Sequence, residues 1–126
     1  VKIGLVPATI SPYVIAAIGE RWARRYFLTA ERFDAQRAMQ IGLVNEAVNA
    51  EQLDQQINSL IEALLVNGPE AVMAAKQLVF DVSGKPIDQN LIDHSCEVIA
   101  AIRVSEQGQE GLNAFLEKRK PHWTKG

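Results

Sequence analysis

The sequence predicts a mainly helical fold with one or two short strands, on three observations. Apolar residues recur at helical spacing, most clearly over residues 51–67. Prolines, glycines and capping residues divide the chain into segments as long as ordinary helices. Only residues 1–6 and 43–48 have the short, β-branched pattern of a strand or an extended link. The apolar stripe over 51–67 consists of Leu53, Ile57, Leu60, Ile61, Leu64 and Leu65.

Local signals place short helices in the first fifty residues. A helix starts at Ser11-Pro12, because proline fits the first helical turn, and Gly19 divides it into two. Asp34 is the N-cap of a further helix, which ends at Gly42. The first two helices are therefore expected over residues 13–18 and 20–29.

The later helices follow from the same signals. Residues 67–69 (Asn-Gly-Pro) end the helix over 51–67 and begin one over 69–82. Residues 83–86 break the chain, Asp88 caps a helix over 88–104, and Ser105 caps a last one that ends before Pro121. We expect one helical unit over residues 1–126, with 1–50 and 51–126 as its two parts.

The composition excludes several classes of protein. Apolar residues make up 48% and the net charge is −2, so no general basic field exists to hold nucleic acid. No apolar run is long enough to span a bilayer. The single cysteine excludes an internal disulfide and favours a reducing compartment. A cytoplasmic location is expected, or a mitochondrial one if the source is eukaryotic.

Taken alone, the residues indicate no mechanism. Asp93, His94, Ser95 and Cys96 are the groups of a nucleophilic site, but neighbours on a helix point in different directions, and a cysteine that faces the core explains them better. One cysteine and two distant histidines do not make a zinc site, so no metal is expected. The basic tail over 117–125 is either a solvated helix end or a phosphate contact.

Three stretches in order resemble one family. They are Gly4–Pro7, the run from Phe27 to Asn45, and the run from Ser105 to Pro121, which contains Glu110-Gly111, Ala114-Phe115 and Glu117-Lys118-Arg119-Lys120. Together they resemble the crotonase superfamily, the enoyl-CoA hydratases and isomerases. The resemblance implies the C-terminal helical part of the crotonase (ClpP/crotonase) fold. Residues 1–50 would be the end of its core and the active-site rim, and residues 51–126 a helical region for oligomerisation and CoA contact. The stretch over 7–14 is similar to the methylglutaconyl-CoA hydratase-like branch.

The resemblance implies the addition of water to an α,β-unsaturated acyl-CoA by two glutamates, with two backbone N–H groups holding the thioester oxygen. In the family pattern a Pro-Glu pair stands immediately before the segment that begins here at Val1. Both catalytic glutamates would then lie upstream, and the chain alone is expected to be a catalytically incomplete fragment. Coenzyme A enters as part of the substrate, and no separate cofactor is expected.

The resemblance also implies roles for three residues of this sequence. The backbone N–H of Ala8 would point toward the catalytic water, although Ala8-Thr9-Ile10-Ser11 replaces a stretch that is glycine-rich in many hydratases. Phe115 and Lys118 would contact CoA. Trp123 is assigned only a packing role.

Two alternatives remain. The chain could act as a non-catalytic helical oligomerisation module, because apolar stripes left uncovered favour self-association into a homo-oligomer. The parent could instead be an enoyl-CoA isomerase, which shares the scaffold and differs in where its carboxylates stand.

Overall fold

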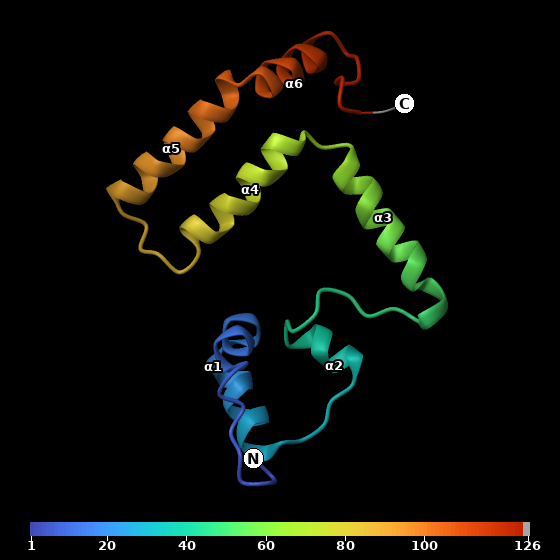
Figure 1. The fold of residues 1–126 in the computed structure, drawn as a ribbon, viewed down its shortest axis with the longest axis vertical. Coiled ribbons are helices and arrows are strands. Elements are labelled where there is room, and N and C mark those ends of the chain that lie inside the picture. The colour runs from blue at the N-terminus through green and yellow to red at the C-terminus, as the bar shows by residue number, and fades with distance from the viewer. Residues whose placement is uncertain (125–126) are drawn as a thin grey trace. The chain divides into compact units, whose positions relative to one another are not determined.

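The fold comes from a computed structural model, which describes residues 1–124. The chain divides into two compact units, Val1–Leu53 and Asp54–Gly126, and each is described by itself (Figure 1). The expectation of a single unit over 1–126 stays a prediction.

The helical fold class is confirmed, but the expected short strands are not present in residues 1–124. Residues 1–6 form a turn and extended backbone instead of a strand, and residues 43–48 form the extended link that was the alternative to a strand. A strand exists only where its backbone groups pair with a second strand, whereas the backbone bonds near the N-terminus are local. The Gly4 N–H donates to the Val1 carbonyl at 2.9 Å, for example.

The first unit contains helices α1 (Ser11–Thr29) and α2 (Ala35–Gln40) and a 3₁₀ turn, η1 (Ala50–Gln52). Helix α1 has two halves that meet at Gly19, whose φ of 74° and ψ of 161° are not helical. This backbone conformation is open almost only to glycine, which confirms the predicted interruption. The predicted cap is also present, since an Asp34 carboxylate oxygen accepts the Arg37 N–H at 2.8 Å.

A small core joins the two helices of this unit. The buried residues Ile18 and Ala23 of α1 meet Ile41, which follows α2. Partly buried side chains surround them: Val14, Trp22, Tyr26, Phe27 and Leu43.

Polar contacts tie the same two helices together. The Arg37 guanidinium donates to the Tyr26 hydroxyl at 3.0 Å and lies 4.4 Å from the centre of the Trp22 ring. A guanidinium over an aromatic face is attracted to it, so Arg37 stabilises the packing of α2 against α1.

Most of the second unit is built from four helices, α3 (Leu53–Leu65), α4 (Pro69–Val82), α5 (Gln89–Val104) and α6 (Glu106–Leu116). Both N-caps predicted here are confirmed. Asp88 accepts the Leu91 N–H at 3.0 Å, and the Ser105 hydroxyl accepts the Gly108 N–H at 3.0 Å. These bonds satisfy backbone donors that the first turn of a helix leaves free.

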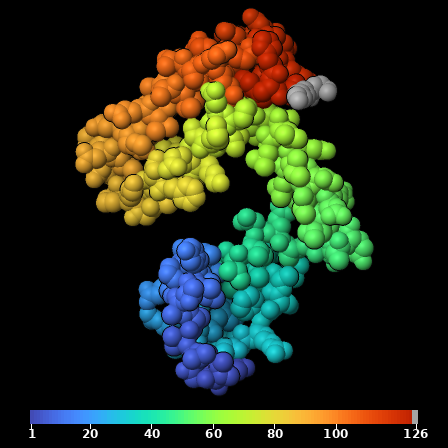
Figure 2. All heavy atoms as spheres, in the orientation of Figure 1, coloured from blue at the N-terminus to red at the C-terminus, as the bar shows by residue number. Residues whose placement is uncertain are grey.

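Helix α4 packs against both α5 and α6, and α5 packs against α6. The ribbon of α5 runs back alongside α4 after a short loop (Figure 1). In Figure 2 the yellow atoms of α4 lie against the orange atoms of α5. A polar link joins the pair, because His94 Nε2 lies 3.2 Å from an Asp81 carboxylate oxygen.

Large apolar side chains remain exposed on this unit. The predicted stripe of α3 is solvent-exposed along its length, and Phe115 and Leu116 at the end of α6 are 81% and 75% exposed. Among the described helices, none has both the length and the apolar character that crossing a membrane requires.

Candidate functional site

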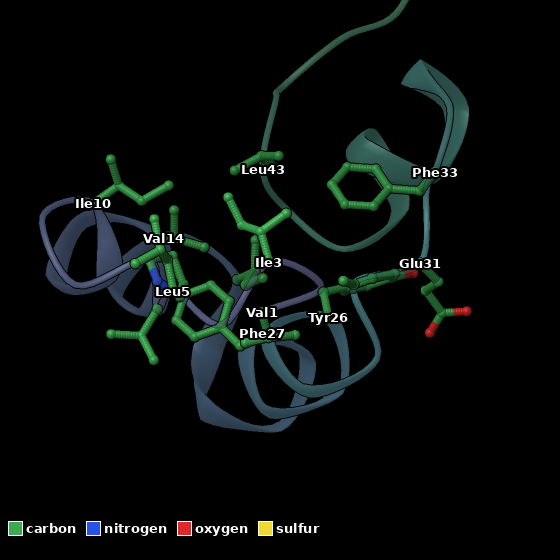
Figure 3. Close-up of a pocket in the computed structure, with 14 residues that line it drawn as sticks. Val1, Ile3, Leu5, Ile10, Val14, Tyr26, Phe27, Glu31, Phe33 and Leu43 are labelled. Carbon is green, nitrogen blue, oxygen red and sulfur yellow. The ribbon is translucent and has the colours of Figure 1, made fainter.

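An apolar pocket lies beside the segment predicted to form the active-site rim. It has a volume of about 520 Å³ and is built entirely from residues of the first unit. The N-terminal segment supplies one wall, including Val6, Pro7 and Ile10, and α1 supplies Val14, Ile18 and Phe27. Figure 3 shows the apolar side chains of Leu5, Val14 and Phe27 close together. Such a lining suits a hydrocarbon group rather than a charged one.

One carboxylate, that of Glu31, lines the pocket, and it is already hydrogen-bonded within the protein. Glu31 accepts hydrogen bonds from the Arg25 guanidinium, at 3.1 Å to Nη2, and from the Thr29 hydroxyl at 3.1 Å. The hydrogen bonds from Arg25 lower the pKa of Glu31 below its ordinary value. A carboxylate held in its charged form by an arginine is a poor general acid, so Glu31 does not provide proton transfer to this pocket.

The predicted rim residue Ala8 lies next to this pocket in sequence, between Pro7 and Ile10. Its N–H donates to the Val6 carbonyl at 2.9 Å. This bond closes a tight turn over only three residues. The Ala8 N–H could therefore donate to a water molecule only by breaking or sharing its hydrogen bond to Val6. Its role toward the catalytic water stays a prediction.

The other two predicted residues, Phe115 and Lys118, lie at the C-terminal end of α6 in the second unit. Phe115 is in the last turn, and the Lys118 N–H donates to its carbonyl at 3.2 Å. Lys118 has a φ of 55°, in the left-handed region, and its side chain is exposed. An exposed aromatic ring and an ammonium group thus stand three residues apart at one helix end.

Sequence reasoning missed the cluster that organises the residues after α6. Arg119 donates to both carboxylate oxygens of Glu110, at 2.6 and 2.8 Å, and Nε donates to Glu117 at 2.6 Å. The His122 N–H donates to Glu110 at 2.9 Å. Hydrogen bonds from Arg119 lower the pKa of Glu110 to about 2. The nine-residue spacing of Glu110 and Arg119 belongs to no helical pattern, so only the fold reveals the pair.

The basic tail is therefore not a uniform solvated cluster. Arg119 forms ion pairs with Glu110 and Glu117, whereas Lys118 and Lys120 have no ion pair within residues 1–124. Lys125, the last cation of the predicted tail, lies outside the described residues.

The stretch Asp93–Cys96 does not form a nucleophilic site. The Asp93 carboxylate accepts from Gln89, His94 faces Asp81, and the Ser95 hydroxyl donates to the Leu91 carbonyl. The expectation that Cys96 faces the core is wrong, because this free thiol is exposed. Within the described residues, no three His, Cys, Asp or Glu side chains are grouped to hold a metal ion.

Comparison with known proteins identifies the family. The family model described as "Enoyl-CoA hydratase/isomerase" matches residues 1–126. The chain belongs to this family. A solved structure of an enoyl-CoA hydratase from Shewanella pealeana is 53% identical, with a TM-score of 0.89, and the match covers 97% of this chain and 45% of that one.

Further relatives agree. A solved enoyl-CoA hydratase/isomerase from Marinobacter aquaeolei is 34% identical with a TM-score of 0.90, and the match covers 98% of this chain and 47% of that one. The 1,4-dihydroxy-2-naphthoyl-CoA synthase of Mycolicibacterium smegmatis is 32% identical over 91% of this chain and 37% of its own length. The chain thus spans less than half the length of each of these relatives.

Proposed function

We propose that this chain is the C-terminal part of an enoyl-CoA hydratase-like enzyme, which adds water to the double bond of an α,β-unsaturated acyl-CoA. The observation that carries the proposal is that all 126 residues match the family while covering 45–47% of the two solved relatives. Relatives that bear the names enoyl-CoA hydratase and crotonyl-CoA hydratase support the reaction.

Proton transfer belongs to residues that precede this chain. Hydration needs a carboxylate near the acyl group that can give and take a proton. Glu31, the carboxylate that lines the apolar pocket, is bonded to Arg25 with a lowered pKa, which is the opposite of what a general acid requires. Both catalytic glutamates are therefore assigned to upstream residues, and the chain alone is inactive.

The chain itself contributes to the edge of the acyl site. The apolar pocket beside Pro7 receives the acyl group, and the Ala8 N–H orients the attacking water once that N–H is released from Val6. The similarity of residues 7–14 to the methylglutaconyl-CoA hydratase-like branch supports a branched, carboxylated enoyl-CoA as the substrate.

The end of α6 contacts coenzyme A. Lys118 supplies a charge for a phosphate and Phe115 an apolar face, and both side chains are exposed. Coenzyme A arrives as part of the substrate, and the reaction uses no separate cofactor.

The exposed apolar side chains support a second role in assembly. Leu60, Leu64 and Leu65 of α3 are 53%, 57% and 68% exposed, and leaving such a stripe in water is unfavourable by roughly 25 cal/mol per Å². The chain therefore forms a homo-oligomer. Light scattering on the purified chain tests this, and a stable monomer over a wide concentration range contradicts it.

The reaction is tested on two purified proteins, this chain and the longer polypeptide that carries the preceding residues of its gene. Loss of the enoyl-thioester absorbance is followed with crotonyl-CoA and methylglutaconyl-CoA, and the products are identified. We expect hydration by the longer protein, faster with methylglutaconyl-CoA, and none by this chain. Turnover by this chain at its confirmed mass contradicts the upstream assignment, and a shifted double bond without water addition identifies an isomerase.

Two substitutions in the longer protein test Ala8. Ala8→Pro removes the N–H, and Ala8→Gly is the matched control that keeps it. We expect Ala8→Pro to lower kcat about tenfold, the value of one hydrogen bond, and Ala8→Gly to have little effect. Equal activity of the two variants contradicts the assigned role.

A further inference from the structure

The chain reverses direction after α6, and Lys118 stands at the reversal. Its φ of 55° is left-handed, which is unfavourable for a residue with a Cβ atom. The Arg119 N–H donates to the Ala114 carbonyl at 3.0 Å, closing the helix end. The backbone that carries Lys118 is thus held in one conformation by the contacts of residues 119–123.

The first of two attachments after the reversal is made by Glu110. Its carboxylate binds the Arg119 guanidinium through two hydrogen bonds and also accepts the His122 N–H at 2.9 Å. The Glu110 side chain is only 17% exposed, so the contact is sheltered. These bonds fold residues 119–122 back along α6.

The second attachment is made by the Trp123 ring. A Cβ atom placed on Gly111 of α6 would lie 3.1 Å from Trp123 Cη2, and one placed on Gly68 would lie 3.4 Å from Cζ2. The ring therefore lies in a slot beside Gly111, where a Cβ atom would crowd it, and at ordinary van der Waals distance from a Cβ atom at Gly68. Its indole N–H donates to the Val66 carbonyl at 3.2 Å.

The slot connects the reversal to the rest of the unit. Gly68 and Val66 belong to the link between α3 and α4, and Gly111 belongs to α6. Trp123 consequently fixes the segment after Lys118 against two separate parts of the backbone. None of these contacts involves the Lys118 side chain itself.

We propose that Trp123 is a positioning residue that holds the Lys118 turn in the conformation that binds the phosphate groups of the acyl-CoA. This inference rests on the proposed function and adds to it a residue that does not touch the ligand. Ordering a lysine side chain on binding costs affinity, and ordering the backbone beneath it adds a further cost unless that backbone is already placed. Docking of Trp123 provides that placement before the ligand arrives.

The test is a double-mutant cycle in the longer hydratase, with Trp123→Ala, Lys118→Ala and the two combined. We expect Trp123→Ala to raise KM for crotonyl-CoA about 3- to 10-fold, because the backbone of the Lys118 turn must then be ordered when the ligand binds, while kcat changes less than about twofold. If Trp123 acts through Lys118, it adds almost nothing to KM in the Lys118→Ala background. Trp123→Phe, which keeps a ring in the slot, should restore most of the wild-type KM.

Gly111→Ala provides the same test without removing the indole. The added methyl group would lie 3.1 Å from the ring, which must then shift by a few tenths of an ångström, while alanine favours the helix at that position. Circular dichroism verifies that each variant folds, and if Trp123→Ala does not fold, Gly111→Ala takes its place in the cycle. Gln109→Ala, on the same helix and with a side chain that donates to the Arg103 carbonyl, is the control and should leave KM unchanged.

Independent, multiplicative effects of Trp123→Ala and Lys118→Ala on KM overturn the inference, as does a loss of kcat with KM unchanged. A wild-type longer protein that uses no enoyl-CoA overturns the proposed function, and the positioning role with it. The two failures differ, because in the first the wild-type enzyme is active.

Discussion

Helix α4 is capped by a residue from another helix, and this predicts the effect of one substitution. Its N-cap position, Gly68, has no side chain to accept a hydrogen bond. The Gln107 side-chain oxygen of α6 accepts the N–H groups of Glu70 and Ala71 instead, at 2.9 and 3.3 Å. One side chain therefore satisfies two donors at the start of α4 and also joins α4 to α6.

Gln107→Ala should destabilise the chain by about 1–2 kcal/mol. Loss of an N-cap acceptor costs about 1 kcal/mol, and the contact at 3.3 Å adds a smaller amount because water replaces it in part. For a chain of this size we expect the melting temperature to fall by roughly 3–8 °C. Gln107→Glu should keep or raise stability, since a carboxylate accepts the same N–H groups and favours the positive end of the helix dipole.

Thermal and urea unfolding followed by circular dichroism, at one fixed protein concentration, measures these changes. Gln109→Ala is the matched control, because Gln109 lies two residues away and its side chain donates to the Arg103 carbonyl of the preceding helix. A loss of stability in Gln107→Ala no larger than in Gln109→Ala, or a loss in Gln107→Glu as large as in Gln107→Ala, refutes the capping role of Gln107.

Three further predictions concern other parts of the chain. Gly19→Ala should lower the free energy of unfolding by about 1–3 kcal/mol in urea, because φ of 74° with ψ of 161° is open almost only to glycine. The loss would come from the backbone alone, since no atom lies within 4 Å of the added methyl group, and an unchanged urea midpoint contradicts this. The pKa of Glu110 is lowered to about 2 from an ordinary 4.5, so its ion pair contributes stability that is complete above pH 4.5 and is lost as the pH falls toward 2. Urea midpoints measured from pH 7 to 2 should therefore fall in the wild type by more than in Glu110→Gln, and identical pH profiles refute this. Cys96 should react fully with a maleimide in the native chain because its thiol is exposed, and protection that urea removes would show that this face is covered in solution.

Short-range signals in the sequence determined where the helices lie. Asp34, Asp88 and Ser105 each cap the helix that follows, through a bond to a backbone N–H three residues later. Gly19 interrupts α1 as expected, because the freedom to adopt a positive φ is a property of glycine itself. Such features depend on neighbours within one helical turn, so a sequence pattern contains them. The strands were mispredicted because a strand depends on a partner that no local pattern supplies.

The tertiary structure decided which side chains meet across the chain. Gln107 caps a helix that starts 38 residues earlier, counted from Pro69, and Trp123 bonds to a carbonyl 57 residues away. Glu110 and Arg119 find each other only because the chain reverses at Lys118. These contacts arise from packing: Trp123 fits beside Gly111, where a Cβ atom would crowd its ring, and Gln107 accepts the free N–H groups at the start of α4. By itself the sequence determined the helices and the family resemblance, while only the packed chain determined the contacts that hold the segment after α6.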